Sequence, residues 1–590
     1  MNKCMNQLTR LLMGGLLLTV GIGMMSAAKK EKITIVYAGN TVKVSQPKNK
    51  NIQIRHDGAK VVVESAVSDQ EMEYVLKGHS TNGSFELNGV YKATVTLDGV
   101  NLKAQEGAAI NLKCGKRMKL HIAKGSQNSL EDGTDTLHKA CVYTKGHLEI
   151  EGAGSLTLKG HSNNVISAKE YLELQPSLGN VRISSSTANA LNTNASLTIS
   201  GGNVEIELSS VDKKALKSDS TMTINGGVVK VVMTGDGGKG IKCGGDFVMN
   251  GGTLDIKTLG SFVSERPFGF GGFGGFGDGE MPDFGGGFPD FGEGGMPDFG
   301  GFGGGFGGFG GAMPDSINFG GFPGFGEGGM PDFGGFGGGF GGFGGFGGGN
   351  DVQISDSVRT LLFGNTSDDR PVGFAKRKFN GSAKGIKVVG KVIINGGDIR
   401  VETASDGAEG IEGKKGFSIN GGNIYVKAHD DGFSSNGPIA FHGGDVFVWS
   451  VGNDAIDTNS NSRESLVITG GKVTACSQVG PPEEPFDSDF SQMTLTGGTV
   501  FGMGGSMTGS APMPKESAET QLTVSLNGLP CPVGKTLQCV DEKGKVLYSF
   551  VLPFTVRSSN SILSLPQFEK GKTYKVKIKD PDVVLKEFSF

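Results

Sequence analysis

The stretch Met222-Thr223-Ile224-Asn225-Gly226-Gly227 recurs along the chain, as Val392-Ile393-Ile394-Asn395-Gly396-Gly397 and as Phe417-Ser418-Ile419-Asn420-Gly421-Gly422. Apolar and polar residues nearly alternate before each glycine pair, which is typical of a short β-strand that ends in a turn. Such pairs begin at residues 201, 226, 251, 396, 421, 443, 470 and 497. Their spacing is 25, 25, 145, 25, 22, 27 and 27 residues, so the sequence predicts a repeat of about 25 residues with one long insertion.

Each repeat contains two further strand-like segments. One follows the glycine pair, as in Val229-Lys230-Val231-Val232. The other precedes the glycine strand and usually has a small residue followed by an apolar one. The aligned pairs are Val165-Ile166, Ala190-Leu191, Ala215-Leu216, Gly240-Ile241, Gly385-Ile386, Gly410-Ile411, Gly432-Phe433, Ala455-Ile456 and Pro485-Phe486. Three short strands per repeat leave no room for a crossover helix, so we expect an all-β chain folded as a right-handed parallel β-helix, a solenoid.

The repeat divides the chain into six predicted regions. They are a signal peptide at 1–28, an N-terminal β lead-in or cap at 29–90, the first part of the β-helix at 91–259, a Gly/Phe-rich insertion at 260–380, the second part of the β-helix at 381–510 and a C-terminal β cap at 520–590. The signal peptide is predicted from Lys3 and Arg10 before an apolar run, and from the small residues Ser26-Ala27-Ala28. We therefore expect an exported protein, secreted or on the cell surface, without a transmembrane span.

The insertion is a low-complexity tract of GFGGFG type, with Met-Pro-Asp motifs that begin at residues 281, 296, 313 and 330. Glycine at this density opposes a packed core, which favours a disordered loop that leaves a turn between two coils. The alternative is a flexible adhesive arm, because regularly spaced Phe rings can stack on sugars or on other Phe-rich chains.

Two columns of side chains flank the small-apolar pairs, one residue before each pair and one residue after it. The preceding column is Asn164, Asn189, Lys214, Lys239, Lys384, Glu409, Asp431, Asp454 and Glu484. The following column is Ser167, Asn192, Lys217, Lys242, Lys387, Glu412, Ser434, Asp457 and Asp487. Stacked coils place equivalent residues about 4.8 Å apart, so each column is predicted to run from a neutral zone through a basic zone to an acidic zone.

Like charges at that spacing repel by about 1 kcal/mol per pair in water, so each zone needs a counter-charge. For the acidic zone we predict calcium, which prefers several oxygen ligands in a flexible geometry. The predicted calcium ligands are Glu409, Glu412, Asp431, Asp454, Asp457, Glu484, Asp487 and Asp489. For the basic zone we predict an extended polyanion such as pectin. The predicted polysaccharide-binding residues are Lys214, Lys217, Lys239, Lys242, Lys384 and Lys387. The alternatives are solvated charge, or lysines paired with Asp212, Asp219 and Asp236.

Catalytic residues are not predicted. The eight histidines fall in no repeated column, and none has a recognisable Ser, Asp or metal-ligand partner in the sequence. Paired carboxylates can hydrolyse glycosides at suitable separations, but metal binding explains the acidic columns at least as well. No residue is placed as the base that a lyase needs beside calcium. The formal net charge of −4 also excludes a strongly basic nucleic-acid-binding protein.

Three further segments resemble a known family. They are Tyr91-Lys92-Ala93-Thr94-Val95-Thr96-Leu97-Asp98-Gly99-Val100, Gly125-Ser126-Gln127-Asn128-Ser129-Leu130-Glu131-Asp132-Gly133 and Leu148-Glu149-Ile150-Glu151-Gly152-Ala153-Gly154-Ser155-Leu156-Thr157-Leu158. With the later Gly-Ile-Lys turns and Ile-Asn-Gly-Gly ends, they resemble the calcium-binding, carbohydrate-binding β-helix domains of secreted bacterial proteins, described from plant-cell-wall-degrading clostridia. The resemblance covers most of residues 85–510 outside the insertion.

This resemblance implies a non-catalytic surface protein that binds acidic plant or microbial polysaccharide, such as polygalacturonate, with calcium in the turns. The chain departs from the family pattern in its lysine-bearing turns and in its Gly/Phe-rich insertion. The first functional hypothesis is therefore a calcium-stabilised binding module for anionic polysaccharide. The alternatives are a calcium-dependent polysaccharide lyase of the β-helix class, and a structural adhesin in which the helix is a stalk and the insertion adheres.

Overall fold

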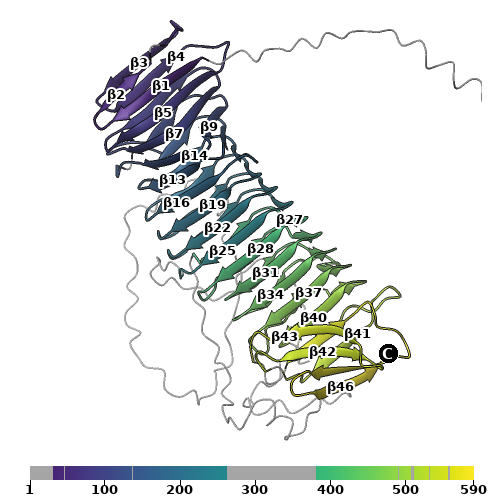
Figure 1. Cartoon of the computed structure of the whole chain (residues 1–590). Coiled ribbons are helices and arrows are strands. Elements are labelled where there is room, and N and C mark those ends of the chain that lie inside the picture. Colours follow the sequence, from purple (N-terminus) through teal and green to yellow (C-terminus); the bar gives the residue numbers. More distant parts are fainter. Residues whose placement is uncertain are drawn as a thin grey trace, which may run out of the picture. The chain divides into compact units, whose positions relative to one another are not determined.

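The computed structural model describes residues 31–261, 381–506, 511–530, 532–555 and 559–590, except residues 46, 136 and 490. The described residues form strands and no helix, which confirms the all-β prediction. Successive strands wind into coils that stack as a parallel β-helix (Figure 1). None of the described segments is a helix of the length and hydropathy that a membrane span requires. The predicted signal peptide and most of the Gly/Phe-rich insertion lie outside the described residues.

One strand of each coil belongs to a 14-stranded sheet, which is parallel except for the hairpin of its first two strands. In sheet order these strands are β3 (Ile52–Asp57), β4 (Lys60–Ser65), β6 (Ser84–Gly89), β8 (Ile110–Leu112), β11 (Val142–Thr144), β14 (Asn164–Ala168), β17 (Asn189–Thr193), β20 (Lys214–Ser218), β23 (Lys239–Cys243), β26 (Lys384–Val388), β29 (Ile411–Gly413), β32 (Phe433–Ser435), β35 (Ile456–Thr458) and β38 (Phe486–Ser488).

The other two strands of each coil belong to a 28-stranded sheet. The middle strands of the coils are β9 (Met118–Ile122), β12 (Leu148–Glu151), β15 (Leu172–Leu174), β18 (Leu197–Ile199), β21 (Met222–Ile224), β24 (Phe247–Met249), β27 (Val392–Ile394), β30 (Phe417–Ile419), β33 (Ile439–Phe441), β36 (Leu466–Ile468) and β39 (Thr494–Leu495). The strands that follow them are β10 (Gln127–Glu131), β13 (Ser155–Gly160), β16 (Asn180–Ser185), β19 (Asn203–Leu208), β22 (Val228–Met233), β25 (Thr253–Thr258), β28 (Asp398–Thr403), β31 (Asn423–Ala428), β34 (Asp445–Ser450), β37 (Lys472–Ser477) and β40 (Thr499–Gly504).

The first coils are built from longer strands. Strand β1 (Lys32–Ala38) forms an antiparallel hairpin with β2 (Thr41–Val44) and pairs in parallel with β5 (Met72–Ser80). Strand β5 in turn pairs with β7 (Ala93–Lys103). The hairpin therefore lies at the start of the stack, beside the first parallel coil.

The register of the strands confirms that residues one coil apart become neighbours. Lys214 on β20 lies beside Lys239 on β23, which lies beside Lys384 on β26. The second pairing joins residues that are 145 positions apart in the sequence, a separation also bridged by the hydrogen bond between Asn250 and Asn395. The long insertion therefore leaves the helix between two coils that still pair directly.

The glycine pairs and the asparagine before them have separate physical roles. Gly227 has a φ of +84°, and a Cβ there would lie 2.7 Å from the carbonyl carbon of Gly201 on the previous coil, so only glycine fits. Asn250 donates its side-chain amide to Asn225 at 2.8 Å, and Asn395 donates to Asn250 at 2.8 Å. These ladders tie the turns of successive coils together, while apolar side chains fill the interior.

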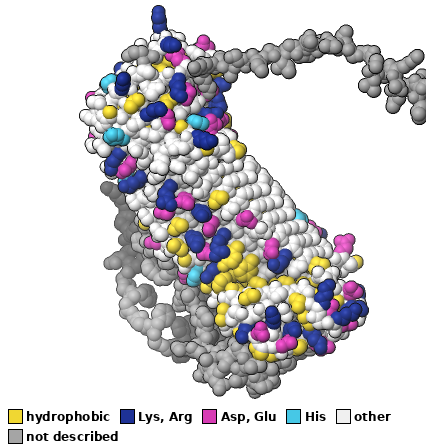
Figure 2. All heavy atoms as spheres, viewed as in Figure 1, with side chains coloured by type: hydrophobic (Ala, Val, Ile, Leu, Met, Phe, Trp, Pro, Cys, Tyr) yellow, Lys and Arg dark blue, Asp and Glu magenta, His cyan; other side chains and the backbone are white. Residues whose placement is uncertain are grey.

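The C-terminal strands form a smaller structure against the last coils. Strand β44 (Asn560–Ser564) pairs antiparallel with both β40 and β41 (Thr523–Asn527). A separate four-stranded antiparallel sheet has the order β43 (Val546–Val551), β42 (Thr536–Asp541), β45 (Thr573–Ile578) and β46 (Val583–Ser589). Trp449 stacks on Phe554 with ring centroids 5.4 Å apart, and Phe447 meets Phe550 at 5.7 Å. Hydrophobic side chains gather where β34 and β37 meet this sheet (Figure 2).

Candidate functional site

Both predicted columns run along the 14-stranded sheet. In the following column, strand register places the residues side by side in the order Ser167, Asn192, Lys217, Lys242, Lys387, Glu412, Ser434, Asp457 and Asp487. In the preceding column, register pairs Lys214, Lys239 and Lys384, and backbone hydrogen bonds continue the stack through Glu409, Asp431, Asp454 and Glu484. The coils therefore bring the predicted lysines and acids into two continuous strips.

Most lysines of the basic zone are more buried than their sequence pattern suggests. Lys239, Lys384 and Lys387 are only 8%, 6% and 7% exposed. Lys214 Nζ lies 3.1 Å from Asp212 Oδ1, and Lys239 Nζ lies 3.5 Å from the same atom. Burial lowers the pKa of Lys214 and Lys239, although Asp212 acts in the opposite direction. These lysines have internal counter-charges, which matches one of the alternatives drawn from the sequence.

Lys217 and Lys242 are the more accessible members of the basic zone, and both are half-buried. Lys217 Nζ lies 2.9 Å from Asp219 Oδ1, and its side chain is 27% exposed. Lys242 has no ion-pair partner among the described residues. These two cations are therefore the best placed in the basic zone to attract a ligand from solution.

The basic and acidic zones meet in a buried ionic junction. Lys384 Nζ lies 2.6 Å from Glu409 Oε2 and 2.7 Å from Glu412 Oε2, and Lys387 Nζ lies 3.7 Å from Glu412 Oε2. Burial disfavours the charged form of Glu412, but Lys384 and Lys387 outweigh it and hold its pKa at about 2. Lys414 also pairs with Glu412. Lysine therefore outweighs burial at Glu412, whereas burial still raises the pKa of Glu409 in spite of its ion pair with Lys384.

The acidic zone beyond the junction lacks such balance. Asp431, Asp454 and Asp457 are 7%, 7% and 9% exposed. Burial and then repulsion from neighbouring carboxylates raise the pKa of Asp457 to about 8 and that of Asp487 to about 6. The same causes raise the pKa of Asp431 and Asp454 well above the usual range. No Lys, Arg or His among the described residues forms an ion pair with any of these four aspartates.

The donor chemistry of the acidic zone fits a hard cation. Asp431 Oδ1 is buried and has no hydrogen-bond partner, and the other candidates also offer carboxylate oxygens, the ligands that calcium prefers. Within the described ranges, however, no three His, Cys, Asp or Glu side chains are grouped closely enough to hold a metal ion. The aspartates thus supply suitable atoms without forming a closed coordination shell.

A cleft of about 290 Å³, here called the amide cleft, lies at the neutral end of the columns. It is lined by Lys139, Tyr143, Asn163, Asn164, Ser167, Lys169, Asn192 and Asn194. Lys139 Nζ lies 5.3 Å from the centroid of the Tyr143 ring, and both Lys139 and Lys169 are exposed. The cleft combines an aromatic ring, amides and accessible cations, which suit a carboxylated sugar.

His138 belongs to a polar network that the sequence did not reveal. Its Nδ1 lies 3.0 Å from Asp135 Oδ1, and its Nε2 lies 2.7 Å from both Asp132 Oδ2 and Ser162 Oγ. Ser162 also donates to Asp132 Oδ2 at 2.8 Å. The prediction that no histidine has a Ser or Asp partner is therefore wrong.

The network resembles a Ser-His-Asp triad but has a fourth group that changes its chemistry. Because carboxylates face both ring nitrogens of His138, the doubly protonated ring is favoured, and that form cannot accept the proton of Ser162. Asp132 is 1% exposed and also accepts the backbone N–H of His161 at 2.7 Å. The arrangement acts as a structural clamp on the loop before β11.

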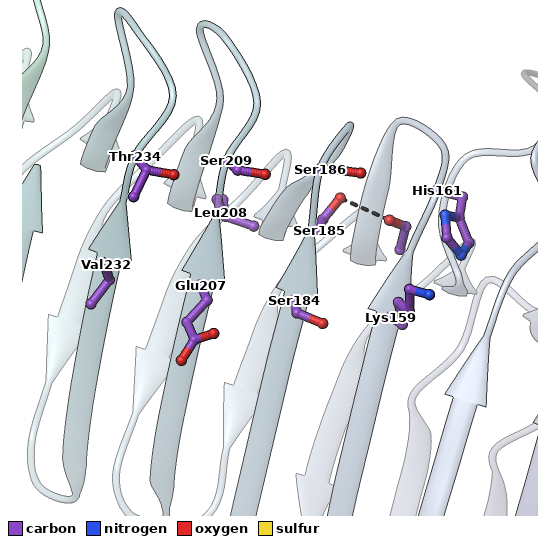
Figure 3. A pocket seen from close by; sticks show the side chains of 11 residues that line it. Lys159, His161, Ser184, Ser185, Ser186, Glu207, Leu208, Ser209, Val232 and Thr234 are labelled. Carbon is purple, nitrogen blue, oxygen red and sulfur yellow. Dashed lines mark hydrogen bonds between the residues drawn. The ribbon is translucent and has the colours of Figure 1, made fainter. Parts of the chain in front are cut away.

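A second groove, here called the hydroxyl groove, has a volume of about 380 Å³ and crosses the ends of β13, β16, β19 and β22 (Figure 3). It is lined by Lys159, Gly160, His161, Ser184, Ser185, Ser186, Glu207, Leu208, Ser209, Val232 and Thr234. Four successive coils contribute to it, so it runs in the direction in which the coils stack.

The sequence matches a protein-family model described as "Carbohydrate-binding domain-containing protein" over residues 57–267 and 378–500. These segments make up more than half of the chain and flank the Gly/Phe-rich insertion on both sides. The chain belongs to this family. All residues of the two columns, the amide cleft and the hydroxyl groove lie inside the segments that match the carbohydrate-binding family.

A curated relative with the same description, from Acetivibrio thermocellus, is 28% identical over 144 residues. The alignment covers 21% of this chain and 50% of the relative, so the chain spans about half the length of that carbohydrate-binding protein. A solved structure described as the polysaccharide lyase-like protein from C. thermocellum, a gadolinium derivative, is 23% identical with a TM-score of 0.32. That alignment covers 39% of this chain and 91% of the solved chain.

For this member of the carbohydrate-binding family, the sequence located the charged columns and, with them, Asn164, Ser167 and Asn192 of the amide cleft. It did not locate Lys139 and Tyr143, because these residues precede the aligned repeat and entered neither column. The hydroxyl groove was not predicted, because serines beside strand ends carry no charge pattern. The sequence does contain a sign of the His138 network, because Ser162 follows His138 by 24 residues, which is close to the length of one coil.

Proposed function

We propose that the chain is a non-catalytic carbohydrate-binding protein that holds an acidic polysaccharide, such as polygalacturonate, along its 14-stranded sheet. The strand register is the observation that supports this most directly, because it aligns amide, lysine and carboxylate side chains in one line. Membership of the carbohydrate-binding family supports the ligand class. A polymer with one carboxylate per sugar carries its charge at a regular interval, as the columns do.

The polymer would first meet the accessible cations. Lys139 and Lys169 are exposed at the amide cleft, and Lys217 and Lys242 are half-buried in the next coils. The more deeply buried lysines add positive potential without direct contact. We therefore propose that the bound chain extends from the amide cleft over the basic zone.

We also propose calcium as the counter-charge of the acidic zone. The candidate ligands are Asp431, Asp454, Asp457 and Asp487, with Glu484 and Asp489 in the same last coil. When bound, calcium supplies the positive charge that these buried carboxylates lack, and it is a cation whose coordination uronate oxygens can share. Export through the predicted signal peptide at 1–28 completes the proposal, since extracellular fluids are rich in calcium and polysaccharide.

The lyase alternative needs an available base beside the metal. The lysines next to the acidic zone are Lys384, Lys387 and Lys414, and all three pair with Glu412. A protonated lysine held by a carboxylate is a poor base. This pairing favours binding without bond cleavage.

The proposal is tested by titrating polygalacturonate into the protein with calcium present, for the wild type and for Lys242→Glu. We expect the variant to raise the Kd by about tenfold at low salt and to reduce the salt dependence of binding, because it replaces a half-buried cation of the basic zone with an anion. Lys572→Glu is the matched control, since it makes the same charge change on an exposed residue outside the family match.

The same samples distinguish binding from cleavage. Retention of the polymer without new ultraviolet absorbance from unsaturated uronate ends supports a binding protein. Appearance of that absorbance would show a lyase. Equal affinity of the wild type and Lys242→Glu would contradict a polymer site on the basic zone.

A further inference from the structure

The hydroxyl groove contains side chains that the fold itself does not use. Ser185 donates to the carbonyl of Gly160 at 2.8 Å and accepts backbone N–H groups of the following turn, so it is structural. The hydroxyls of Ser184, Ser186 and Ser209 make no hydrogen bond with any described residue, and the same holds for Thr234. Ser186, Ser209 and Thr234 are exposed. They offer unoccupied donors and acceptors along one line (Figure 3).

The spacing of this line follows the coils. Ser186, Ser209 and Thr234 each lie just beyond the end of the corresponding strand in three successive coils, β16, β19 and β22. Paired strands lie about 4.8 Å apart, which is of the order of one monosaccharide unit. Val232 is half-buried and adds apolar surface to the lining, whereas Leu208 is only 2% exposed and belongs to the core. Hydroxyl groups beside apolar surface match the two kinds of face that a sugar ring presents.

The charges at the groove disfavour an acidic ligand. Lys159 Nζ is 3.6 Å from Glu131 Oε1, and His161 Nε2 is 2.8 Å from the same oxygen. The Lys159 ammonium and the His161 ring therefore both have an acid partner outside the lining of the groove. Glu207 is exposed and lines the groove directly, so it repels a uronate chain.

We propose that the hydroxyl groove is a second glycan-binding site, which takes a neutral polysaccharide chain parallel to the stacking direction of the coils. The neutral chain forms hydrogen bonds to Ser186, Ser209 and Thr234 and places a ring face on Val232. This site goes beyond the acidic-polysaccharide proposal and does not depend on it, because its residues share no member with the charged columns.

The test measures binding of xylohexaose, mannohexaose and cellohexaose by titration calorimetry, with hexagalacturonic acid as the acidic probe. The test variant is Ser186→Ala/Ser209→Ala/Thr234→Val in the full-length protein. The matched control removes three other outward hydroxyls that do not line the groove, by Thr157→Val/Thr198→Val/Thr223→Val. Thermal unfolding by circular dichroism checks each variant, and Ser186→Tyr, an exposed substitution that fills the groove, is the second test variant.

We expect at least one neutral hexasaccharide to bind the wild type, and the triple variant to weaken it by about tenfold, equivalent to about 1.4 kcal/mol. Ser186→Tyr should weaken it as well, while the control variant and the affinity for hexagalacturonic acid stay unchanged. The proposal is overturned if none of the neutral probes binds, if both test variants bind like the wild type, or if the neutral and acidic probes weaken together. Loss of acidic binding alone would count against the proposed function and leave this site standing.

Discussion

At the residue scale, His138 lies between two carboxylates of its own loop and a hydroxyl of the next coil. Burial lowers the pKa of its imidazole, but the hydrogen bonds to Asp135 and Asp132 outweigh this and the pKa is raised. The hydrogen bond from the backbone N–H of Gly107 and the one from the His138 ring together lower the pKa of Asp135 to about 2. The clamp is thus held by a positive ring between negative groups.

This arrangement predicts a defined pH dependence. Because the folded pKa of His138 is raised, its stabilisation is fully present below about pH 6.5, the unfolded value, and is lost as pH rises through the folded pKa. We expect His138→Gln to lower the free energy of unfolding by about 1–3 kcal/mol near pH 5.5, and by less near pH 9. Thermal unfolding at both pH values measures this difference.

His121→Gln is the matched control for that prediction. His121 is 37% exposed and, among the residues that the structure describes, pairs with one carboxylate, Glu151, at 3.2 Å. Its loss should cost less than about 1 kcal/mol. An equal effect of the two substitutions, or a larger effect of His138→Gln at high pH, would contradict the clamp.

The burial of an individual side chain is the property that sequence patterns predict least well. Period-2 alternation correctly placed Lys239 and Lys384 next to inward-facing positions, and their register is as expected. Their burial depends on turns from neighbouring coils, which lie about 25 residues away and follow no alternation. For this reason the sequence located the lysines but did not reveal how little of them solvent reaches.

At the scale of elements, the charge of the two columns changes from positive to negative between the paired strands β26 and β29. Lys387 lies beside Glu412 in register, and Lys384 reaches across to the same carboxylate. Each buried ion there depends on its partner, since the desolvation of an unpaired charge is costly. The junction allows the basic and acidic zones to adjoin without a gap in the stack.

We expect Glu412→Gln to lower the free energy of unfolding by about 3–5 kcal/mol, because it leaves two buried lysines short of a counter-charge. Denaturant unfolding followed by circular dichroism measures the change. The control is Glu402→Gln on β28, whose partners Arg400 and Lys257 are 47% and 42% exposed, and it should cost less than about 1 kcal/mol. Similar losses in both variants would show that the buried junction contributes no more to stability than a partly exposed ion pair does.

The elements themselves were largely readable from the sequence. Glycine pairs with φ near +84°, as at Gly227 and Gly252, mark the turns because a Cβ there would meet the previous coil. These positions fix the repeat, and the repeat fixes the register. The first coils were less predictable, because their long strands β5 and β7 contain no paired glycine.

At the scale of the whole molecule, the acidic zone makes stability depend on pH and on cations. Burial raises the pKa of Asp457 to about 8 and that of Asp487 to about 6, so the folded state binds more protons than the unfolded state between about pH 4 and pH 8. Stability without metal should therefore fall as pH rises through this range. A bound cation would offset the loss by neutralising the carboxylates.

We expect calcium to raise the melting temperature relative to a chelator, and to do so more near pH 8 than near pH 5. Scanning calorimetry in both buffers measures this. Asp457→Asn should raise the melting temperature in chelator near pH 8, since it removes a buried charge, and should diminish the response to calcium. No calcium effect on the wild type, or a melting temperature in chelator that increases with pH, would count against the assignment.

The direct pairing of β23 with β26 has a practical consequence. Backbone and side-chain bonds close between residues that 145 positions separate, and neither strip shows a step at that seam. The seam is thus a suitable insertion site: a reporter, an enzyme or an epitope grafted between residues 261 and 381 would leave both charged columns intact. A protein with this fold can therefore gain or exchange an inserted domain without any change to the coils on either side.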